Sequence, residues 1–111
     1  MDSPGYDPCS VTGQIASGAN LVVFTTGRGS VSGYMPTPCI KLATNSEMYS
    51  RMKDDMDINC GDIISDNVSI DEKGSEIFEM LIAVASGKTT KSETLGFGGA
   101  EFVPWQIGAV M

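Results

Sequence analysis

The residues best suited to chemistry form one short run that directly follows a stretch of β-branched and aromatic residues, and the run reads Thr26-Gly27-Arg28-Gly29-Ser30. The Arg28 guanidinium can hold a carboxylate or a phosphate through two parallel hydrogen bonds. The glycines beside it allow backbone amides to turn inward as a nest for an anion. A tight glycine turn carrying a solvated arginine is the alternative, and the local pattern leaves both open. All five residues are therefore candidate substrate-binding residues, although their spacing matches neither a dinucleotide fingerprint nor a P-loop.

A second group of candidate residues is acidic and surrounds a cysteine. Asp54, Asp55, Asp57 and Asp62 crowd around Cys60. Carboxylate oxygens suit hard divalent cations, whereas a thiolate favours a softer ion such as iron. We therefore name Asp57 and Cys60 as candidate metal ligands. The alternative is a solvated acidic helix end with a small buried thiol.

Histidine is absent from the chain, which removes the commonest general base and the commonest metal ligand. The cysteines are three in number, widely spaced and without a Cys-x-x-Cys pair, at positions Cys9, Cys39 and Cys60. This pattern predicts three free thiols and excludes a disulfide framework.

Charge and hydropathy exclude two further classes of function. The chain has 7 basic and 14 acidic residues and a formal net charge of -7, which opposes the neutralisation of phosphates that nucleic-acid binding needs. No apolar run approaches the about 20 residues of a membrane span, and the first ten residues do not have the pattern of a signal peptide. We expect a cytoplasmic protein with no nucleic-acid or membrane partner.

Three strands are expected to position these residues. The run Asn-Leu-Val-Val-Phe-Thr at 20–25 predicts a strand buried on both faces of a parallel sheet. Residues 39–43 predict a second strand, and residues 57–61 predict a brief strand that runs into a glycine turn. A loop rich in glycine, serine and proline joins the first two strands over residues 26–38, and loops of this length are often functional.

Helices are predicted between and around the strands. Asp7 is expected to cap a helix over 8–17 that Gly18 ends. A capping box that begins at Thr44 predicts a helix over 44–54, and another that begins at Ser69 predicts the clearest helix, up to Gly87. Residues 88–99 are polar and glycine-rich, and the apolar tail that follows is expected to lie against the body.

The alternation of strands and helices predicts an α/β fold. With 111 residues, the chain fits a single layered domain with a small, mainly parallel sheet and flanking helices, in the Rossmann-like manner. Such a sheet is thin, so we expect it to be completed by the tail or by residues upstream of Met1.

Taken together, four segments resemble the C-terminal region of the altronate and galactarate dehydratase family. The segments occur in matching order, and the resemblance runs nearly from end to end. They are Met1-Asp2-Ser3-Pro4-Gly5-Tyr6-Asp7-Pro8, Phe24-Thr25-Thr26-Gly27-Arg28-Gly29-Ser30, Met56-Asp57-Ile58-Asn59-Cys60-Gly61 and Glu101-Phe102-Val103-Pro104-Trp105-Gln106-Ile107-Gly108.

The resemblance implies that the chain is one C-terminal domain, residues 1–111, of a longer enzyme that removes water from a sugar acid with the help of iron or another divalent metal. The substrate would be D-altronate or D-galactarate and the product a 2-keto-3-deoxy acid; a related branch eliminates sulfite from sulfolactate. We expect the chain alone to be inactive and to bind no metal of its own, since other domains would complete the site. The rival expectation is a noncatalytic assembly domain whose loop and tail form contacts in a homo-oligomer.

Overall fold

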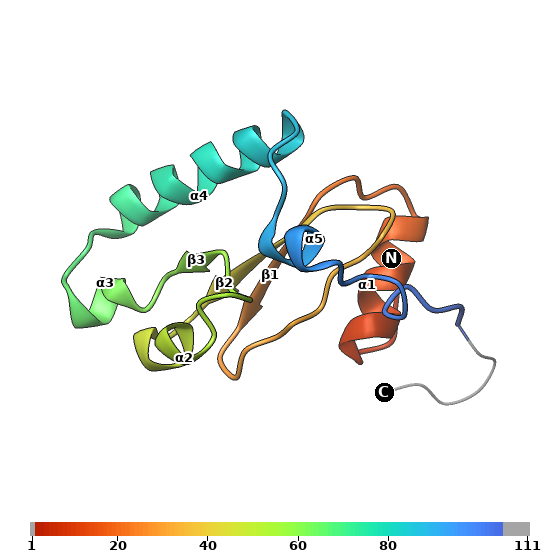
Figure 1. Ribbon diagram of the computed structural model, residues 1–111, viewed down its shortest axis with the longest axis horizontal. Helices are drawn as coiled ribbons and strands as arrows, with labels where there is room; N and C mark the ends of the chain where they lie inside the picture. The colour runs from red at the N-terminus through yellow and green to blue at the C-terminus, as the bar shows by residue number, and fades with distance from the viewer. Residues whose placement is uncertain (1, 106–111) are drawn as a thin grey trace.

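The computed structural model describes residues 2–105 and contains one small sheet with helices around it (Figure 1). All three strands are parallel and lie in the order β1-β2-β3, which confirms the α/β expectation. The elements in chain order are α1 (Asp7–Ala16), β1 (Val22–Thr26), β2 (Cys39–Ala43), α2 (Ser46–Arg51), β3 (Ile58–Asn59), α3 (Asp62–Ser65), α4 (Ile70–Ala85) and α5 (Lys91–Leu95).

The central strand of the sheet is β2, and all five of its residues are buried. Its neighbour β1 pairs with it from Val22 opposite Cys39 onward. The prediction that β1 is buried on both faces is wrong, because Val23 and Thr25 are exposed. These two side chains point to the same face of the sheet, the face on which α4 lies. The helix covers β2 and β3 on that face and leaves β1 uncovered.

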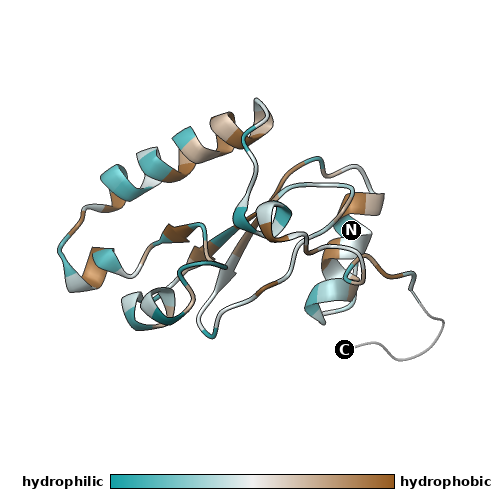
Figure 2. Cartoon of the chain, in the orientation of Figure 1, coloured by the Kyte–Doolittle hydropathy of each residue, from teal (hydrophilic) through white to brown (hydrophobic). Residues whose placement is uncertain are grey.

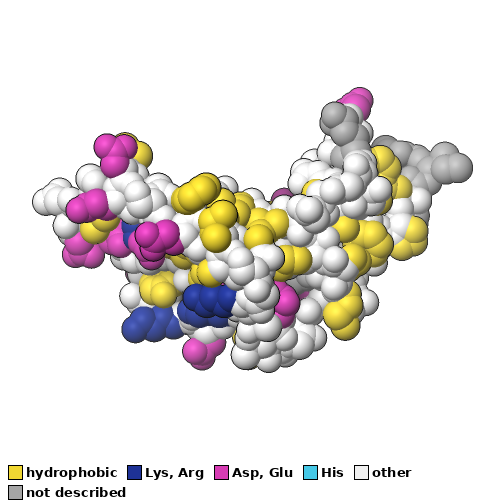
Figure 3. Space-filling model, turned by 90° about the horizontal axis from the view of Figure 1, so that it is seen from above, with side chains coloured by type: hydrophobic (Ala, Val, Ile, Leu, Met, Phe, Trp, Pro, Cys, Tyr) yellow, Lys and Arg dark blue, Asp and Glu magenta, His cyan; other side chains and the backbone are white. Residues whose placement is uncertain are grey.

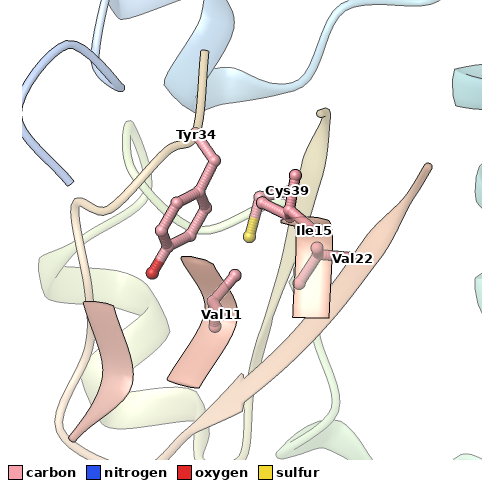
Figure 4. Close-up of a cluster of buried hydrophobic side chains, with 5 residues drawn as sticks. All are labelled: Val11, Ile15, Val22, Tyr34 and Cys39. Carbon is pink, nitrogen blue, oxygen red and sulfur yellow. The ribbon is translucent and has the colours of Figure 1, made fainter. Parts of the chain in front are cut away.

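Two clusters of buried side chains lie on opposite faces of the sheet, because successive residues of a strand point to opposite sides. On one face, side chains from α1, β1, β2 and the loop before β2 point toward one another (Figure 4). On the other face, α4 packs on β2 and β3 through Val84, Ile40, Leu42 and Ile58. The strands are therefore held between helices on both sides.

The sequence signals of α4 are confirmed in detail. Ser69 accepts a hydrogen bond from the Glu72 amide, and the Glu72 carboxylate accepts one from the Ser69 amide, each at 3.1 Å. This reciprocal cap satisfies two amides that a helix start leaves unpaired. Gly87, which follows the helix, has a φ of +113°, as expected of a glycine that ends a helix.

Two other predicted caps are wrong. Tyr6, not Asp7, precedes the first turn of α1, and no side chain caps that helix. Asn45, not Thr44, caps α2, which ends at Arg51 rather than near residue 54. Both errors are shifts of one residue at the start; at α2 several cap-forming residues, Thr44, Asn45 and Ser46, stand in a row.

The short helix α5 lies in the segment where no element was predicted. A glutamate three residues inside the helix, Glu93, accepts from the Thr90 amide at 3.2 Å, and Gly96 ends it with a φ of +80°. The tail beyond it contacts α1, as predicted: Trp105 Nε1 donates to the Cys9 carbonyl at 2.7 Å.

All three cysteines are free thiols, as the spacing predicts. Burial raises the pKa of Cys39 to about 12 and also raises the pKa of Cys60. Within residues 2–105, no helix is long and apolar enough to cross a membrane.

Candidate functional site

The carboxyl ends of the three parallel strands meet at one edge of the sheet, where ligands bind in open α/β sheets. The loop that contains Arg28 begins at this edge, directly after β1. The Thr44-Asn45 turn follows β2, and the Cys60-Gly61 turn follows β3. The fold therefore brings the predicted substrate-binding loop beside the turn that contains the candidate metal ligand Cys60 and beside the Thr44-Asn45 turn, which was not assigned to the site.

Asn45 fixes the Arg28 loop from the neighbouring strand. Its side-chain amide donates to the Gly27 carbonyl at 2.9 Å, while its side-chain oxygen accepts from the Met48 amide at 2.8 Å. The backbone amide and the hydroxyl of Thr44 both donate to the Thr26 carbonyl, at 3.1 and 3.2 Å. One residue therefore caps α2 and holds the loop at the same time.

Gly29 is needed at its position for two reasons. It has a φ of +96°, which side-chain-bearing residues rarely adopt, and a Cβ there would overlap the sulfur of Met52. Its amide donates to the Thr26 hydroxyl at 3.1 Å. This amide is therefore occupied within the loop, and the open anion nest that the glycines suggest is only partly formed.

Arg28 is the member of the predicted set whose functional group is free. Its side chain is exposed and, within the described part of the chain, makes no hydrogen bond or ion pair. The hydroxyl of Ser30, by contrast, accepts from the Ser32 amide at 3.1 Å. The loop thus presents one guanidinium from a backbone that its neighbours hold in place.

Asp57 lies at the amino end of β3 and connects three segments. One carboxylate oxygen accepts from the Lys41 amide of β2 at 2.8 Å, and the other accepts from the Lys91 amide of α5 at 2.9 Å. The Asp57 amide donates in turn to the Lys41 carbonyl at 2.9 Å. Both oxygens are therefore used to join β2, β3 and α5.

Cys60 follows the same short strand at its other end. Its side chain is half-buried against the cluster under α4, whereas the two Asp57 oxygens are occupied by the Lys41 and Lys91 amides. Within residues 2–105, no three His, Cys, Asp or Glu side chains gather where they could hold a metal ion. The arrangement does not fit a metal shared by Asp57 and Cys60.

Lys41 is a buried residue that the sequence analysis did not select. It sits in the middle of β2 and is 0% exposed, and its Nζ has no hydrogen-bond partner among the described residues. Burial lowers the pKa of the Lys41 amine, although the nearby Asp57 carboxylate opposes this. Lysine is rarely buried in full, so its residue type gave no indication of this burial.

Lys41→Met is expected to stabilise the protein by about 1–2 kcal/mol at pH 7, because burying an amine without a partner costs free energy that a thioether avoids. Since the folded pKa is lowered, the unfolded chain binds the extra proton between the two pKa values. The cost of Lys41 therefore falls as the pH rises toward about 10.5, the ordinary lysine value. Urea unfolding of both proteins from pH 6 to pH 10 measures the difference, and a constant difference across this range would contradict the role of lysine ionisation.

Comparison with known proteins gives the family and several relatives of this chain. The family model described as "D-galactarate/Altronate dehydratase, C-terminal" matches residues 1–110. Galactarate dehydratase (L-threo-forming) of Escherichia coli strain K12 is 45% identical over 86 residues, which are 78% of this chain and 16% of that protein.

Two further relatives have other names. Altronate dehydratase of Bacillus subtilis strain 168 is 34% identical over 97 residues, covering 87% of this chain and 19% of the relative. The (2R)-sulfolactate sulfo-lyase subunit beta of Chromohalobacter salexigens is 33% identical over 96 residues, which are 86% of this chain and 25% of that protein. The chain thus spans between about a sixth and a quarter of the length of these relatives. Since the family model covers almost every residue, the chain belongs to the D-galactarate/altronate dehydratase C-terminal family.

Proposed function

We propose that this chain is the C-terminal part of a sugar-acid dehydratase, a hydro-lyase that removes water from an aldonate or aldarate such as D-altronate or D-galactarate to give a 2-keto-3-deoxy acid. Membership of the family and the names of two relatives support the reaction class. The structural observation that carries the proposal is Arg28, an exposed and unpaired guanidinium at the carboxyl ends of the strands. Its role is to hold the substrate carboxylate.

The chemistry of the proposed reaction explains why such a residue is useful. Elimination of water beside a carboxylate begins with removal of a proton from the adjacent carbon, so the carboxylate must be held still relative to the base. A planar guanidinium fixes both oxygens of a carboxylate at once. The hydrogen bonds from Asn45 and Thr44 hold the backbone of the two residues before Arg28, which fixes where this side chain leaves the loop.

The rest of the reaction requires residues outside this chain. The relatives are about three and a half to five times as long as this chain, and this sequence contains no histidine to act as a base. A divalent metal such as iron remains part of the proposal for the whole enzyme. Because Asp57 and Cys60 do not fit a shared metal site, no step assigned to this chain depends on a metal. The proposed place of action is the cytoplasm.

A sulfo-lyase reaction is the second candidate, favoured by the relative named (2R)-sulfolactate sulfo-lyase subunit beta. Loss of sulfite from sulfolactate is also an elimination beside a carboxylate, so the same arginine would serve. The two candidates differ in the leaving group, which residues of this chain are not proposed to contact.

Arg28→Ala in the full-length enzyme is expected to lower kcat/KM by tenfold or more, since each ~1.4 kcal/mol of lost transition-state binding is a factor of ten. Arg28→Lys keeps the charge but loses the planar fork, so it should lower kcat/KM less than alanine does. The assays use D-galactarate, D-altronate and sulfolactate separately, so that they also identify the substrate.

The matched control is Arg51→Ala, which removes another exposed arginine whose only ion pair within residues 2–105 is a 3.9 Å contact with Glu47. It should leave kcat/KM unchanged. Thermal melts of all three variants should be nearly identical to that of the parent protein. Full activity in a well-folded Arg28→Ala enzyme would refute the anchoring role and favour the noncatalytic assembly domain.

A further inference from the structure

The helix α4 has a second apolar face that nothing in the described chain covers. Its inner face packs on the sheet through Ile77, Leu81 and Val84. Three other apolar side chains, Ile70, Phe78 and Ile82, are 75%, 62% and 54% exposed. In Figure 2, the first turns of α4 after Ile70 are mainly hydrophilic, and the hydrophobic colour gathers in the second half of the helix. A helix that only covered this sheet would have polar residues at these positions.

The exposed residues form one line along the helix, with a glycine inside it. Ile70, Gly74, Phe78 and Ile82 are each four positions apart and so lie on the same side of a helix. A Cβ added at Gly74 would meet no atom within 4 Å, so packing inside this chain does not require a glycine there. Glycine in the middle of a helix is unfavourable relative to alanine. Gly74 therefore lowers the stability of the helix, and no contact within the described residues requires a glycine there.

Because Gly74 has no side chain, it leaves a gap, here called the notch, between Ile70 and Phe78 on the helix surface. An open groove of about 590 Å³ runs over it, lined by Ile70, Asp71, Gly74, Ser75, Phe78 and Glu79. Seen from the side of α4, hydrophobic side chains appear between acidic ones in Figure 3. The groove is thus open and shallow and lies on α4 alone, with Ile70 and Phe78 as its apolar lining, Asp71 and Glu79 along one edge, and space at Gly74 for a side chain from elsewhere.

A second copy of this chain does not suit the groove well. An antiparallel pair of α4 helices would bring Asp71 of one copy near Glu79 of the other, and each chain has a net charge of -7. Three side chains, which bury at most about 200 Å² each, also fall short of the about 800 Å² per partner of a stable complex between separate proteins. A contact within one polypeptide needs less area, because the two surfaces are already tethered.

We infer that the Ile70–Ile82 line of α4 is the surface by which this domain docks on the remainder of its own longer polypeptide. This inference rests on the part of the proposed function that makes the chain one piece of a longer enzyme. At least three quarters of the length of each relative lies outside the matched region. The corresponding part of this polypeptide is the proposed occupant of the surface. The acidic edge specifies that occupant as an apolar surface flanked by lysine or arginine, with one side chain that enters the notch at Gly74.

The test compares the same substitutions in the 111-residue chain and in the longer enzyme. Gly74→Leu should raise the Tm of the chain by about 4 °C, because leucine is a better helix former than glycine. In the longer enzyme, the same leucine should lower the Tm by several degrees, because it fills the space that the docked side chain needs. Phe78→Lys should change the Tm of the chain by less than about 1 °C and lower that of the enzyme.

Hydrogen exchange gives the second readout. The amides of residues 70–85 should exchange at least tenfold more slowly in the longer enzyme than in the chain, and Phe78→Lys should abolish the difference. The control is Met35→Lys, which changes an apolar residue that is also 75% exposed but lies in the loop before β2; it should have no effect on either readout for α4.

An increase in Tm with Gly74→Leu in both proteins, or equal exchange of α4 in both, would overturn the inference. Sedimentation of the chain alone as a dimer that Phe78→Lys dissociates would also overturn it, in favour of a second copy. Neither readout measures turnover. Failure of docking is therefore distinguishable from failure of the proposed reaction, which the Arg28 variants test.

Discussion

Asp57→Ala is expected to destabilise the protein by about 4 kcal/mol. The Asp57 carboxylate accepts from two backbone amides, those of Lys41 and Lys91, and each hydrogen bond to a charged group contributes about 1.5–3 kcal/mol. Alanine leaves both amides without their partner and removes the negative charge nearest to the buried Lys41 amine. Asp57→Asn should cost less, since its single side-chain oxygen can still accept from one of the two amides.

Urea unfolding at pH 7 measures the loss, with Asp54→Ala as the matched control. Asp54 is exposed and three residues away in the same acidic run, so its replacement should change stability by less than about 0.5 kcal/mol. The measurement also separates the two roles considered for Asp57. A metal ligand with no structural role would leave the stability of the metal-free protein unchanged on replacement by alanine, and that result would refute the joining role described above.

Gly61→Ala is expected to destabilise the protein by about 3 kcal/mol, at the upper end of the usual cost of overpacking. The backbone of Gly61 has a φ of -68° and a ψ of -19°, which alanine adopts readily, so backbone strain is not the cause. An added Cβ would lie 2.5 Å from the carbonyl carbon and 2.6 Å from the Cα of Asn45. These are backbone atoms, which cannot rotate away as a side chain can.

The consequence should extend to the candidate site, because Asn45 holds the Arg28 loop through Gly27. In the full-length enzyme, Gly61→Ala should therefore lower kcat/KM even at a temperature where the protein remains folded. Gly99→Ala is the control, since a Cβ there meets no atom within 4 Å; it should change neither property. Equal stability of the Gly61 and Gly99 variants would show that the close approach of the two turns does not exist in solution.

Local signals in the sequence were reliable where one short segment contains all the information. The Ser69–Glu72 capping box and the glycine after α4 work through hydrogen bonds between near neighbours. The strand at residues 39–43 was predicted with the correct bounds, and the Arg28 loop was placed at the correct end of its strand. Errors of one residue occurred at Asp7 and Thr44; at Thr44 the adjacent Asn45 has similar capping ability, and Asp7 lies inside the first turn of α1.

Burial in the sheet could not be predicted from residue type. The run Val22–Phe24 is the most apolar, yet its strand lies at the edge of the described sheet with Val23 exposed, whereas Lys41 is fully buried in the centre. The order of strands decides this, and it results from contacts between segments far apart in the chain. Similarly, the apolar residues of α4 do not share one environment, since Val84 is buried whereas Ile70, Phe78 and Ile82 are exposed.

The sequence by itself determined the alternation of strands and helices, the free thiols, and an arginine between two glycines after a strand. Each of these depends on composition or on residues within one turn of one another. Only the tertiary structure decided that Asp57 joins β2 to α5 while Cys60 packs under α4, and that Asn45 holds the Arg28 loop. The physical reason is that a carboxylate or an amide has the same chemistry wherever it stands, and its role depends on which donors and acceptors the fold brings within about 3 Å of it.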